Sequence, residues 1–291
     1  MNIAKIGVIG AGLMGNGIVH TALLSGYDVT LIDAFEAALP KAIATMSKNM
    51  DRQVAKGTIT AAAKDAALKR LVTGQDLSLL QGADLVVEAV PEQEALKEQL
   101  YRQIAPHLGP DTILASNTSS LSITKLAALS GRSDKFIGMH FFNPVPMMKL
   151  VEIIRGLATS DATFAAAQQV ADKLGKTVAA AEDAPGFIVN RILCPMINEA
   201  IFALQEGTGT APAIDAGLKL GANHPMGPLE LADFIGLDTL LAIMRVLHEG
   251  LGEDKYRPCP LLVKYVNAGW LGRKSGRGFY DYTVNPPRPT C

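Results

Sequence analysis

The chain has 291 residues, of which 48% are hydrophobic, so it is long enough for one large domain or two ordinary ones with a sizeable core. Its 27 Lys and Arg residues nearly balance its 28 Asp and Glu residues, which excludes an overall electrostatic field that would attract nucleic acid or an anionic membrane. Any charged ligand must therefore bind at a local cluster of charges.

The three cysteines, Cys194, Cys259 and Cys291, are odd in number and far apart, so they fit neither a disulfide framework nor the spacing of a metal site. The N-terminal residues show no secretory pattern, because glycines interrupt their apolar run. No stretch approaches the ~20 apolar residues of a membrane span. We therefore expect a soluble, cytoplasmic protein without a metal site.

The first half of the chain alternates short β-branched runs with helical stretches, which is typical of a parallel sheet with crossover helices. The apolar runs are nearly continuous, as in strands covered on both faces. We expect strands at residues 5–10, 28–33, 83–90, 112–117, 135–142, 150–154 and 177–181. Between them, the Ala- and Lys-rich residues from about 36 to 68 predict an arm of two helices.

The strand pattern ends near Pro185 and Gly186, a dipeptide that predicts a turn into a new helix. Beyond it, apolar residues recur at helical spacing. We therefore predict an α/β domain over residues 1–186, with a Rossmann-type, doubly wound and mostly parallel sheet, and an all-α domain over residues 187–291. The tail from residue 285 is expected to be frayed.

A Gly-x-Gly-x-x-Gly motif follows the first predicted strand and opens a helix. Gly10 would permit the tight turn, Gly12 the close approach of a pyrophosphate, and Gly15 the close packing of helix on strand. The helix N-terminus would face the phosphates. A flexible glycine turn is the alternative. The residues expected to contact a dinucleotide here are Gly10, Gly12, Leu13, Met14 and Gly15.

Asp33 strengthens that prediction, because it ends the next predicted strand 18 residues after Gly15 and can accept hydrogen bonds from a ribose diol. Its carboxylate would repel a 2′-phosphate, and the following Ala34 and Phe35 supply no cation. The sequence therefore predicts NAD rather than NADP as the cofactor.

Residues 139–146, MHFFNPVP, place His140 in an apolar run that prolines end. A lone histidine in such a run is more often a core residue bonded to the backbone. A neutral imidazole can also exchange a proton near neutral pH, so a role in acid–base chemistry is the alternative. From the residues alone, both interpretations of His140 stay open.

Several blocks in one order resemble the 3-hydroxyacyl-CoA dehydrogenase family, from about residue 4 to residue 283. The blocks are GVIGAGLMGNGI, VVEAVPE, SNTSSLSIT, GMHFFNPVPMMKLVEII, PGFIVNRI, HPMGPLELADFIGLD and GRKSGRGFYDY. The resemblance implies an NAD-dependent enzyme that interconverts (S)-3-hydroxyacyl-CoA and 3-oxoacyl-CoA, with short chains such as acetoacetyl-CoA favoured. It also implies a homodimer formed through the second domain.

The resemblance implies that His140 is the catalytic base and that Glu152 holds its tautomer and stabilises the imidazolium. It also implies that Ser119 and Asn190 hydrogen-bond substrate oxygens. The residues alone leave other interpretations open. Glu152 could be an exposed acid on an edge strand, Ser119 part of a helix N-cap, and Asn190 a polar residue on a helix flank.

Further cofactor contacts follow only from the resemblance. Asn143 would lie beside the nicotinamide and the substrate. Glu92, Lys97 and Asn117 match positions that line the cofactor, and Lys274 matches a residue that reaches it from the other domain. Glu92 and Lys97 fit equally well as solvated helix charges.

The predicted arm carries Lys48, Arg52 and Lys56 at four-residue spacing, so these cations share one helix face. By resemblance, Arg52 and Lys56 would contact the CoA nucleotide of the substrate, whereas a solvated charged face is the alternative. Two other functions also remain open: a dehydrogenase of a small free hydroxy acid such as gulonate, and a non-catalytic NAD-binding protein.

Overall fold

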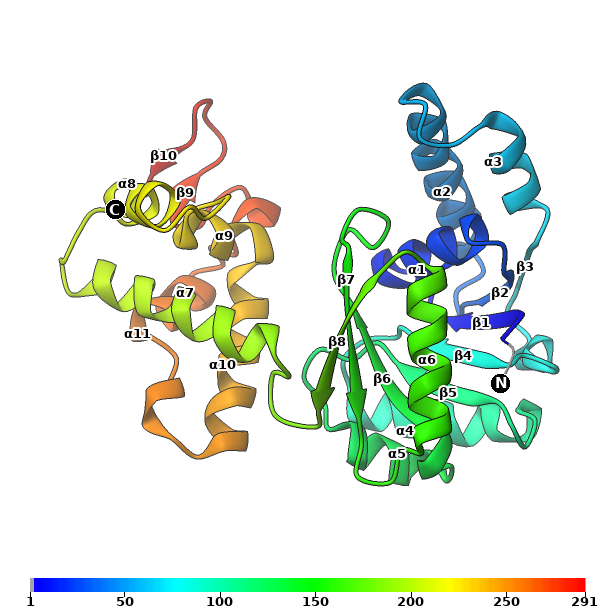
Figure 1. The fold of residues 1–291 in the computed structure, drawn as a ribbon. Coiled ribbons are helices and arrows are strands. Elements are labelled where there is room, and N and C mark those ends of the chain that lie inside the picture. Colours follow the sequence, from blue (N-terminus) through cyan, green and yellow to red (C-terminus); the bar gives the residue numbers. More distant parts are fainter. Residues whose placement is uncertain (1–2, 291) are drawn as a thin grey trace. The chain divides into compact units, whose positions relative to one another are not determined.

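The computed structural model describes residues 3–290, which form two compact units, one ending at Ala184 and one beginning at Pro185 (Figure 1). Cys291 lies outside the described residues. None of the helices within residues 3–290 combines the length and the apolar character that crossing a bilayer requires.

The N-terminal unit is built on an eight-stranded sheet in the order β3-β2-β1-β4-β5-β6-β7-β8. Neighbouring strands are parallel except β6 and β7. The predicted Rossmann-type, mostly parallel sheet is confirmed. The strands are β1 Lys5–Ile9, β2 Asp28–Ile32, β3 Leu71–Gly74, β4 Leu85–Glu88, β5 Ile113–Ser116, β6 Phe136–Phe141, β7 Leu150–Arg155 and β8 Thr177–Glu182.

Strand β3 is missing from the sequence prediction. It has only four residues, lies at one edge of the sheet beside β2, and none of its residues is fully buried. It therefore lacks the apolar run that marks the covered strands, and its pairing with β2 depends on the arm that precedes it bringing the chain back to the sheet edge.

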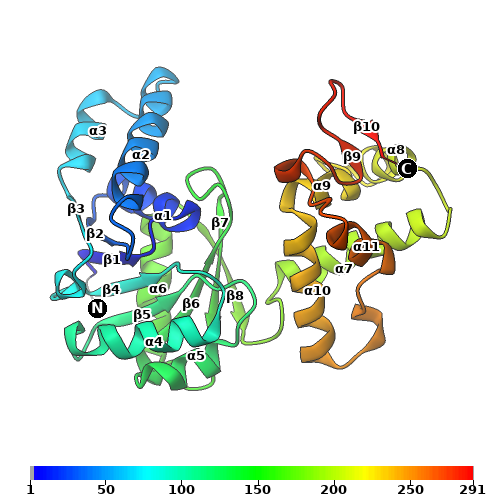
Figure 2. The ribbon, with the colours of Figure 1, turned by 180° about the vertical axis from the view of Figure 1, so that it is seen from behind.

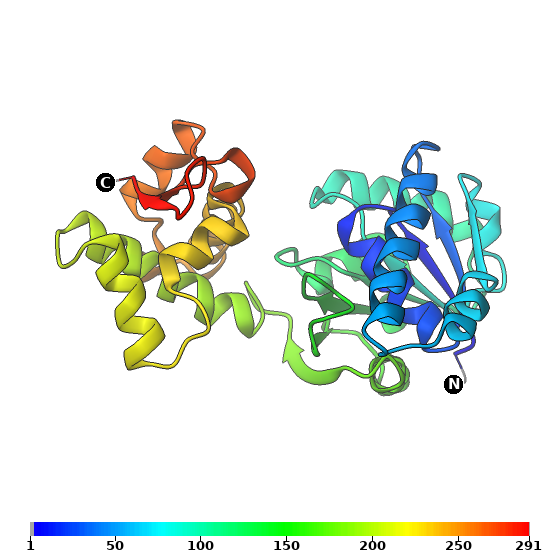
Figure 3. The same cartoon turned by 90° about the horizontal axis from the view of Figure 1, so that it is seen from above.

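Helices cover both faces of the sheet (Figures 1 and 2). Seen from above, the sheet lies between α4 on one side and α6 on the other (Figure 3). The helices of this unit are α1 Leu13–Leu24, α2 Ala38–Ala55, α3 Ala61–Leu68, α4 Glu94–Ile104, α5 Ile123–Ser130 and α6 Asp161–Lys173. Short 3-10 turns are η1 Leu77–Leu80, η2 Ala105–His107 and η3 Ser133–Lys135.

The predicted helical arm corresponds to α2 and α3. Only one side of α2 is buried, through Leu39, Ala42, Met46 and Met50, which belong to the core that α1 and the sheet also form. Apolar residues recurring at three- and four-residue spacing explain this single buried stripe. The opposite side of α2 is left for charged residues.

The C-terminal unit is helical and has its own apolar core. Its elements are α7 Val189–Gln205, α8 Ala211–Ala216, the π-helical turn η4 Gly217–Gly221, α9 Pro228–Ile235, α10 Leu237–Leu251, η5 Asp254–Tyr256, α11 Pro260–Asn267, η6 Arg273–Ser275, β9 Tyr280–Asp281 and β10 Arg288–Pro289. The last two form a short antiparallel ribbon, so the expectation of helices alone is too simple.

The expectation of a frayed tail is also wrong for residues up to 290. Thr290 donates its backbone N–H to the carbonyl of Phe279 at 3.0 Å and its hydroxyl to the carbonyl of Gly278 at 2.7 Å. These bonds continue the β9–β10 pairing. The sequence did not predict β10 because its segment is rich in proline, which is rare in strands except at edges.

Candidate active site

The strand order reverses between β1 and β4, because β1 lies next to β2 on one side and next to β4 on the other. In open sheets of this kind, ligands bind outside the carboxyl ends of the strands at such a point. The glycine loop follows β1, and the segment from Ala89 follows β4. The two segments touch, since a Cβ added to Gly10 would lie 2.5 Å from the carbonyl oxygen of Ala89.

The three glycines of the loop differ in what surrounds them. Gly10 has a φ of +106°, a value that side chains rarely allow. A Cβ on Gly15 would lie 1.8 Å from the carbonyl oxygen of Gly10, whereas a Cβ on Gly12 would meet no atom within 4 Å. No side chain caps α1. The predicted turn and packing are thus present, and the open space before α1 fits a pyrophosphate.

Asp33 lies one residue beyond β2, beside the glycine loop. Its Oδ2 accepts the N–H of Ala11 at 2.7 Å, and its Oδ1 accepts the N–H of Phe35 at 2.8 Å. These bonds hold the carboxylate at the mouth of the loop, and each oxygen keeps a lone pair for a further donor. The arrangement fits the ribose diol of NAD, which is the role predicted for Asp33.

His140 and Glu152 face each other across the one antiparallel pair of the sheet, β6 and β7. Nδ1 of His140 lies 2.6 Å from Oε2 of Glu152, and the two residues are 7% and 0% exposed. A carboxylate at Nδ1 keeps the ring proton there, so that Nε2 carries the acceptor lone pair of the neutral ring. Because β8 pairs outside β7, the alternative of an exposed edge-strand acid is wrong for Glu152.

Asn117 ties together the ends of three strands near this pair. Its Oδ1 accepts the N–H of Phe141 at 2.9 Å, and its own N–H donates to the carbonyl of Glu88 at 2.8 Å. Asn143, two residues beyond β6, is exposed. Contacts of Asn117 and Asn143 with NAD stay predictions, but Asn117 has a structural task as well.

The loop after β5 wraps around the carboxylate of Glu92. Oε1 of Glu92 accepts hydrogen bonds from the Thr118 hydroxyl at 2.5 Å, the Ser119 N–H at 2.8 Å and the Ser120 N–H at 3.1 Å. The Ser119 hydroxyl lies 3.3 Å from the same oxygen. Helix α5 is capped by Ser122, so Ser119 is not needed as an N-cap.

Lys97 is not the solvated helix charge that the sequence left open, because it is 1% exposed. Its Nζ lies 2.7 Å from Oε1 of Glu88 and 3.3 Å from Oε2 of Glu92. Burial works to raise the pKa of Glu92, but Lys97 and the donors of the loop hold this pKa below its usual value. Glu92 is thus kept ionised, and a contact of Lys97 with the cofactor stays a prediction.

Glu88 was not singled out from the sequence. It ends β4, is 0% exposed, and accepts hydrogen bonds from Ser116, Tyr101 and Lys97. One signal was available, since an acid within the apolar run of residues 83–90 cannot be buried without donors. The identity of those donors required the packing of α4 and β5 against β4.

Two predicted site residues belong to the C-terminal unit. Asn190 lies in the first turn of α7 and is half-buried. Lys274 lies on η6, and its Nζ donates to Oδ2 of Asp238 at 2.7 Å. Their predicted contacts with substrate and NAD stay predictions.

The cations of the arm are exposed, and their predicted contact with the CoA nucleotide stays a prediction. Lys48 and Arg52 lie on α2, and Lys56 follows its last residue. Nη1 of Arg52 lies 3.3 Å from the side-chain oxygen of Asn49. Within residues 3–290, none of the three cations forms an ion pair with a carboxylate. Their charges therefore remain available to a phosphate.

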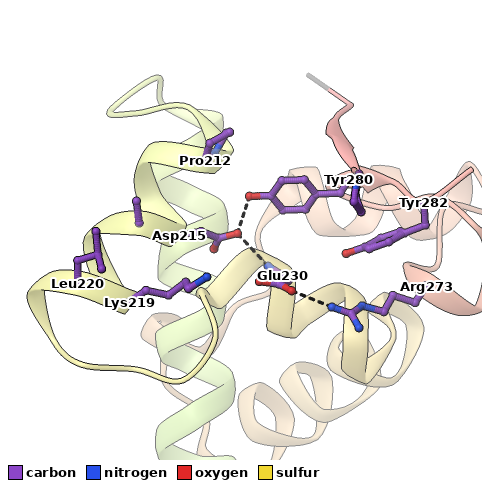
Figure 4. A pocket seen from close by; sticks show the side chains of 10 residues that line it. Pro212, Asp215, Lys219, Leu220, Glu230, Arg273, Tyr280 and Tyr282 are labelled. Carbon is purple, nitrogen blue, oxygen red and sulfur yellow. Dashed lines mark hydrogen bonds and ion pairs between the residues drawn. The ribbon is translucent and has the colours of Figure 1, made fainter. Parts of the chain in front are cut away.

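A cavity of about 690 Å³ lies within the C-terminal unit (Figure 4). Asp215 stands at its wall, where it accepts hydrogen bonds from the N–H groups of Leu229 and Glu230 and from the hydroxyl of Tyr280. Glu230 in turn pairs with Arg273 at 2.8 Å. None of the predicted site residues lines this cavity, and its acids are occupied in joining α8, α9 and β9.

The fold, the glycine loop and the His140–Glu152 pair define the class of a nicotinamide-dependent dehydrogenase. Residues 5–184 match the family model of the 3-hydroxyacyl-CoA dehydrogenase NAD binding domain, and residues 186–282 match that of the 3-hydroxyacyl-CoA dehydrogenase C-terminal domain. The chain belongs to the 3-hydroxyacyl-CoA dehydrogenase family. The predicted enzyme class and the prediction of NAD as cofactor are confirmed.

Relatives agree with this over nearly the whole chain. A 3-hydroxybutyryl-CoA dehydrogenase of Bradyrhizobium diazoefficiens is 59% identical over 99% of this chain and 98% of its own. One from Clostridioides difficile is 47% identical over 96% of this chain and 99% of its own. The crystal structure of (S)-3-hydroxybutyryl-CoA dehydrogenase from Ralstonia eutropha is 50% identical, with a TM-score of 0.95 over 97% of this chain and 100% of that one.

Proposed function

We propose that the protein interconverts (S)-3-hydroxyacyl-CoA and 3-oxoacyl-CoA with NAD(H), and that it prefers short chains such as 3-hydroxybutyryl-CoA and acetoacetyl-CoA. The observation that carries this proposal is the 2.6 Å contact between His140 and Glu152 in the sheet that also bears the nucleotide loop. The names of relatives at 47% and 59% identity support the short-chain preference.

Each residue of the proposed site has a task in this reaction. Bound NAD⁺ supplies a hydride acceptor at its nicotinamide ring. Nε2 of His140 takes the proton of the 3-hydroxyl group, and Glu152 keeps the Nδ1 proton in place and stabilises the imidazolium. Ser119 and Asn190 donate hydrogen bonds to the substrate oxygens, where charge develops.

A turnover assay tests this function against its alternatives. We expect the protein to oxidise NADH in the presence of acetoacetyl-CoA and to be inactive with NAD⁺ and gulonate. Turnover of gulonate alone would assign the protein to free hydroxy acids. Binding of NADH without turnover of either substrate would leave a non-catalytic NAD-binding protein.

The preference for NAD over NADP is proposed from Asp33. A 2′-phosphate would meet this carboxylate without a cation between them, since Ala34 and Phe35 follow it. We therefore expect kcat/KM to be higher with NADH than with NADPH. Equal or better turnover with NADPH would overturn this role of Asp33.

We propose that the N-terminal unit binds NAD and that the C-terminal unit contributes to the substrate site and forms a homodimer. Large apolar side chains are exposed in the C-terminal unit, among them Ile192 at 68% and Phe234 at 50%. By contrast, the apolar side of α10 is buried in the unit's own core. A dimeric mass in solution at micromolar concentration is expected, and a strictly monomeric mass would contradict the proposal.

The cellular setting is proposed to be the cytoplasm, with a role in short-chain fatty acid metabolism. Cys194 and Cys259 support a reducing compartment, because both are free thiols. Fractionation of cells that produce the protein, with its activity assayed in each fraction, would test the location.

A further inference from the structure

A buried ion pair lies beneath the loop that carries Ser119. Nζ of Lys97 lies 2.7 Å and 2.9 Å from the two carboxylate oxygens of Glu88. Glu88 is 0% exposed and Lys97 is 1% exposed. Such a pair is often no more stabilising than apolar side chains of the same size, because both ions lose their hydration. Stability alone is therefore a weak explanation for it.

Both carboxylate oxygens of Glu88 accept further hydrogen bonds besides those from Lys97. Oε1 also accepts the N–H of Val90 at 2.8 Å, and Oε2 accepts the hydroxyls of Tyr101 at 3.0 Å and Ser116 at 2.8 Å. Burial and the neighbouring carboxylate of Glu88 raise the pKa of Tyr101, so its hydroxyl remains a donor. A network this fully satisfied is rigid.

Two routes lead from Glu88 to the Ser119 loop. The direct route passes through Ser116, whose hydroxyl oxygen lies 3.3 Å from the N–H of Thr118. The second route passes through Lys97, which lies 3.3 Å from Glu92. Glu92 in turn accepts the N–H of Ser119 at 2.8 Å.

We infer that Glu88 is a positioning residue of the dehydrogenase, which holds Ser119 in its place for the substrate through Ser116 and through Lys97 and Glu92. This inference rests on the proposed function for the role of Ser119. Glu88 touches neither substrate nor hydride, so its effect on the reaction passes through the loop. Removing its charge frees Lys97 to draw Glu92 away from the loop amides.

The test compares two acids of the β4 segment. Glu88→Gln keeps the shape of the side chain and removes its charge. Asp84→Asn is the matched control, since Asp84 accepts the N–H groups of Ala4 and Lys5 at 2.8 Å and 2.9 Å, at the amino end of the same strand. We expect kcat with acetoacetyl-CoA to fall about 10- to 100-fold in Glu88→Gln and to stay within about twofold in Asp84→Asn. An equal fall in both variants would overturn the inference, because it would report general destabilisation.

A double-mutant cycle supplies a readout that a merely structural role would not move. In a Ser119→Ala background, Glu88→Gln should change kcat less than about threefold, because the loop residue it positions is already lost. If kcat of the double variant fell by the product of the two single-variant factors, the two residues would act independently and the inference would be overturned. Should Glu88→Gln not fold, Ser116→Ala removes the direct route instead. Ser116→Ala should likewise lower kcat in the otherwise wild-type protein and change kcat little in the Ser119→Ala background.

Binding of NADH separates this inference from the proposed function. If the wild-type protein does not turn over acetoacetyl-CoA, the proposed function fails, and the fluorescence titration of NADH still tests Glu88. Glu92 follows β4 and the Ser119 loop follows β5, at the edge of the sheet where the nucleotide is predicted to bind. The Kd for NADH should therefore rise about 5-fold or more in Glu88→Gln, and it should not change in Asp84→Asn. An unchanged Kd and an unchanged kcat in Glu88→Gln would both count against the inference.

Discussion

Both units of the molecule bury carboxylates, but Glu88 and Glu152 in the N-terminal unit have a basic side chain among their partners. In the N-terminal unit, Glu152 and Glu88 are 0% exposed and bind a histidine and a lysine. In the C-terminal unit, Asp215 and Asp233 are 5% and 1% exposed and bind backbone N–H groups and tyrosine hydroxyls. The physical demand is the same in each case, because a buried carboxylate needs donors.

The difference shows that burial of an acid does not by itself mark a reactive site. Asp233 accepts the N–H groups of Phe279 and Tyr280, both at 2.9 Å, and thereby attaches the last segment of the chain to α9. Glu152 instead acts on an imidazole that can gain and lose a proton. We therefore expect the partner of a buried acid to decide whether the acid serves stability or chemistry.

The largest expected effect comes from His140, the proposed catalytic base. His140→Gln keeps a similar shape but cannot accept the hydroxyl proton. General-base loss is typically worth about 10²- to 10⁴-fold, so kcat should fall by that order while NADH still binds. Steady-state kinetics together with NADH titration check this. A variant with nearly wild-type kcat would return His140 to the role of a core histidine and remove the comparison.

The partner of the histidine should matter less than the histidine itself. Glu152→Gln removes the negative charge that stabilises the imidazolium. A hydrogen bond to a charged group is worth roughly 1.5 to 3 kcal/mol, so kcat should fall about 10- to 100-fold. Single-turnover kinetics with acetoacetyl-CoA measure this fall. If the variant lost thermal stability but kept kcat, Glu152 would belong with the structural acids of the other unit.

Asp233, an acid of the C-terminal unit, should instead make the unfolding free energy of the protein depend on pH. Burial raises the pKa of Asp233 to about 6, above the ordinary value of 3.8, although three donors face it. The folded state therefore holds this proton more tightly than the unfolded state. The stabilisation is fully present below about pH 4 and is lost as the pH rises through about 6.

The non-titrating variant Asp233→Asn isolates this contribution. Between pH 4.5 and 7.5, the unfolding free energy of the wild type should fall by about 2 kcal/mol relative to that of the variant. Chemical denaturation at several pH values measures the difference, and kcat per folded molecule should change little. A difference that grows in the opposite direction would mean that the three donors outweigh burial.

The smallest effect is expected from the exposed cations of the arm, which differ from the buried acids in being solvated. Arg52→Ala with Lys56→Ala should raise KM for acetoacetyl-CoA about 2- to 30-fold, because partly exposed charge contacts are worth roughly 0.5 to 2 kcal/mol together and weaken with salt. A thioester without the nucleotide should be little affected. Lys69→Ala, which removes an exposed cation after α3, is the control. Equal loss with both substrates would make the arm a structural element.

Much of the fold could be predicted from the sequence because its signals are local. Seven strands of the large sheet were predicted from their apolar runs. The glycine motif predicted a strand before it and a helix after it. The predicted partnership of His140 and Glu152 came from family resemblance, whereas their contact depends on the antiparallel pairing of β6 with β7. Spacing of twelve residues does not reveal that pairing.

The sequence by itself determined the two-unit organisation in outline, the Rossmann-type sheet and the family, since periodicity, glycine chemistry and long ordered motifs are properties of the chain alone. Only the tertiary structure decided that Lys97 is buried on Glu88, that Glu92 binds the Ser119 loop, and that Glu152 is covered by β8. A charged residue has the same appearance in the sequence whether water solvates it or an oppositely charged residue pairs with it. Its environment is fixed by segments distant along the chain, and those meet only when the sheet and its covering helices pack.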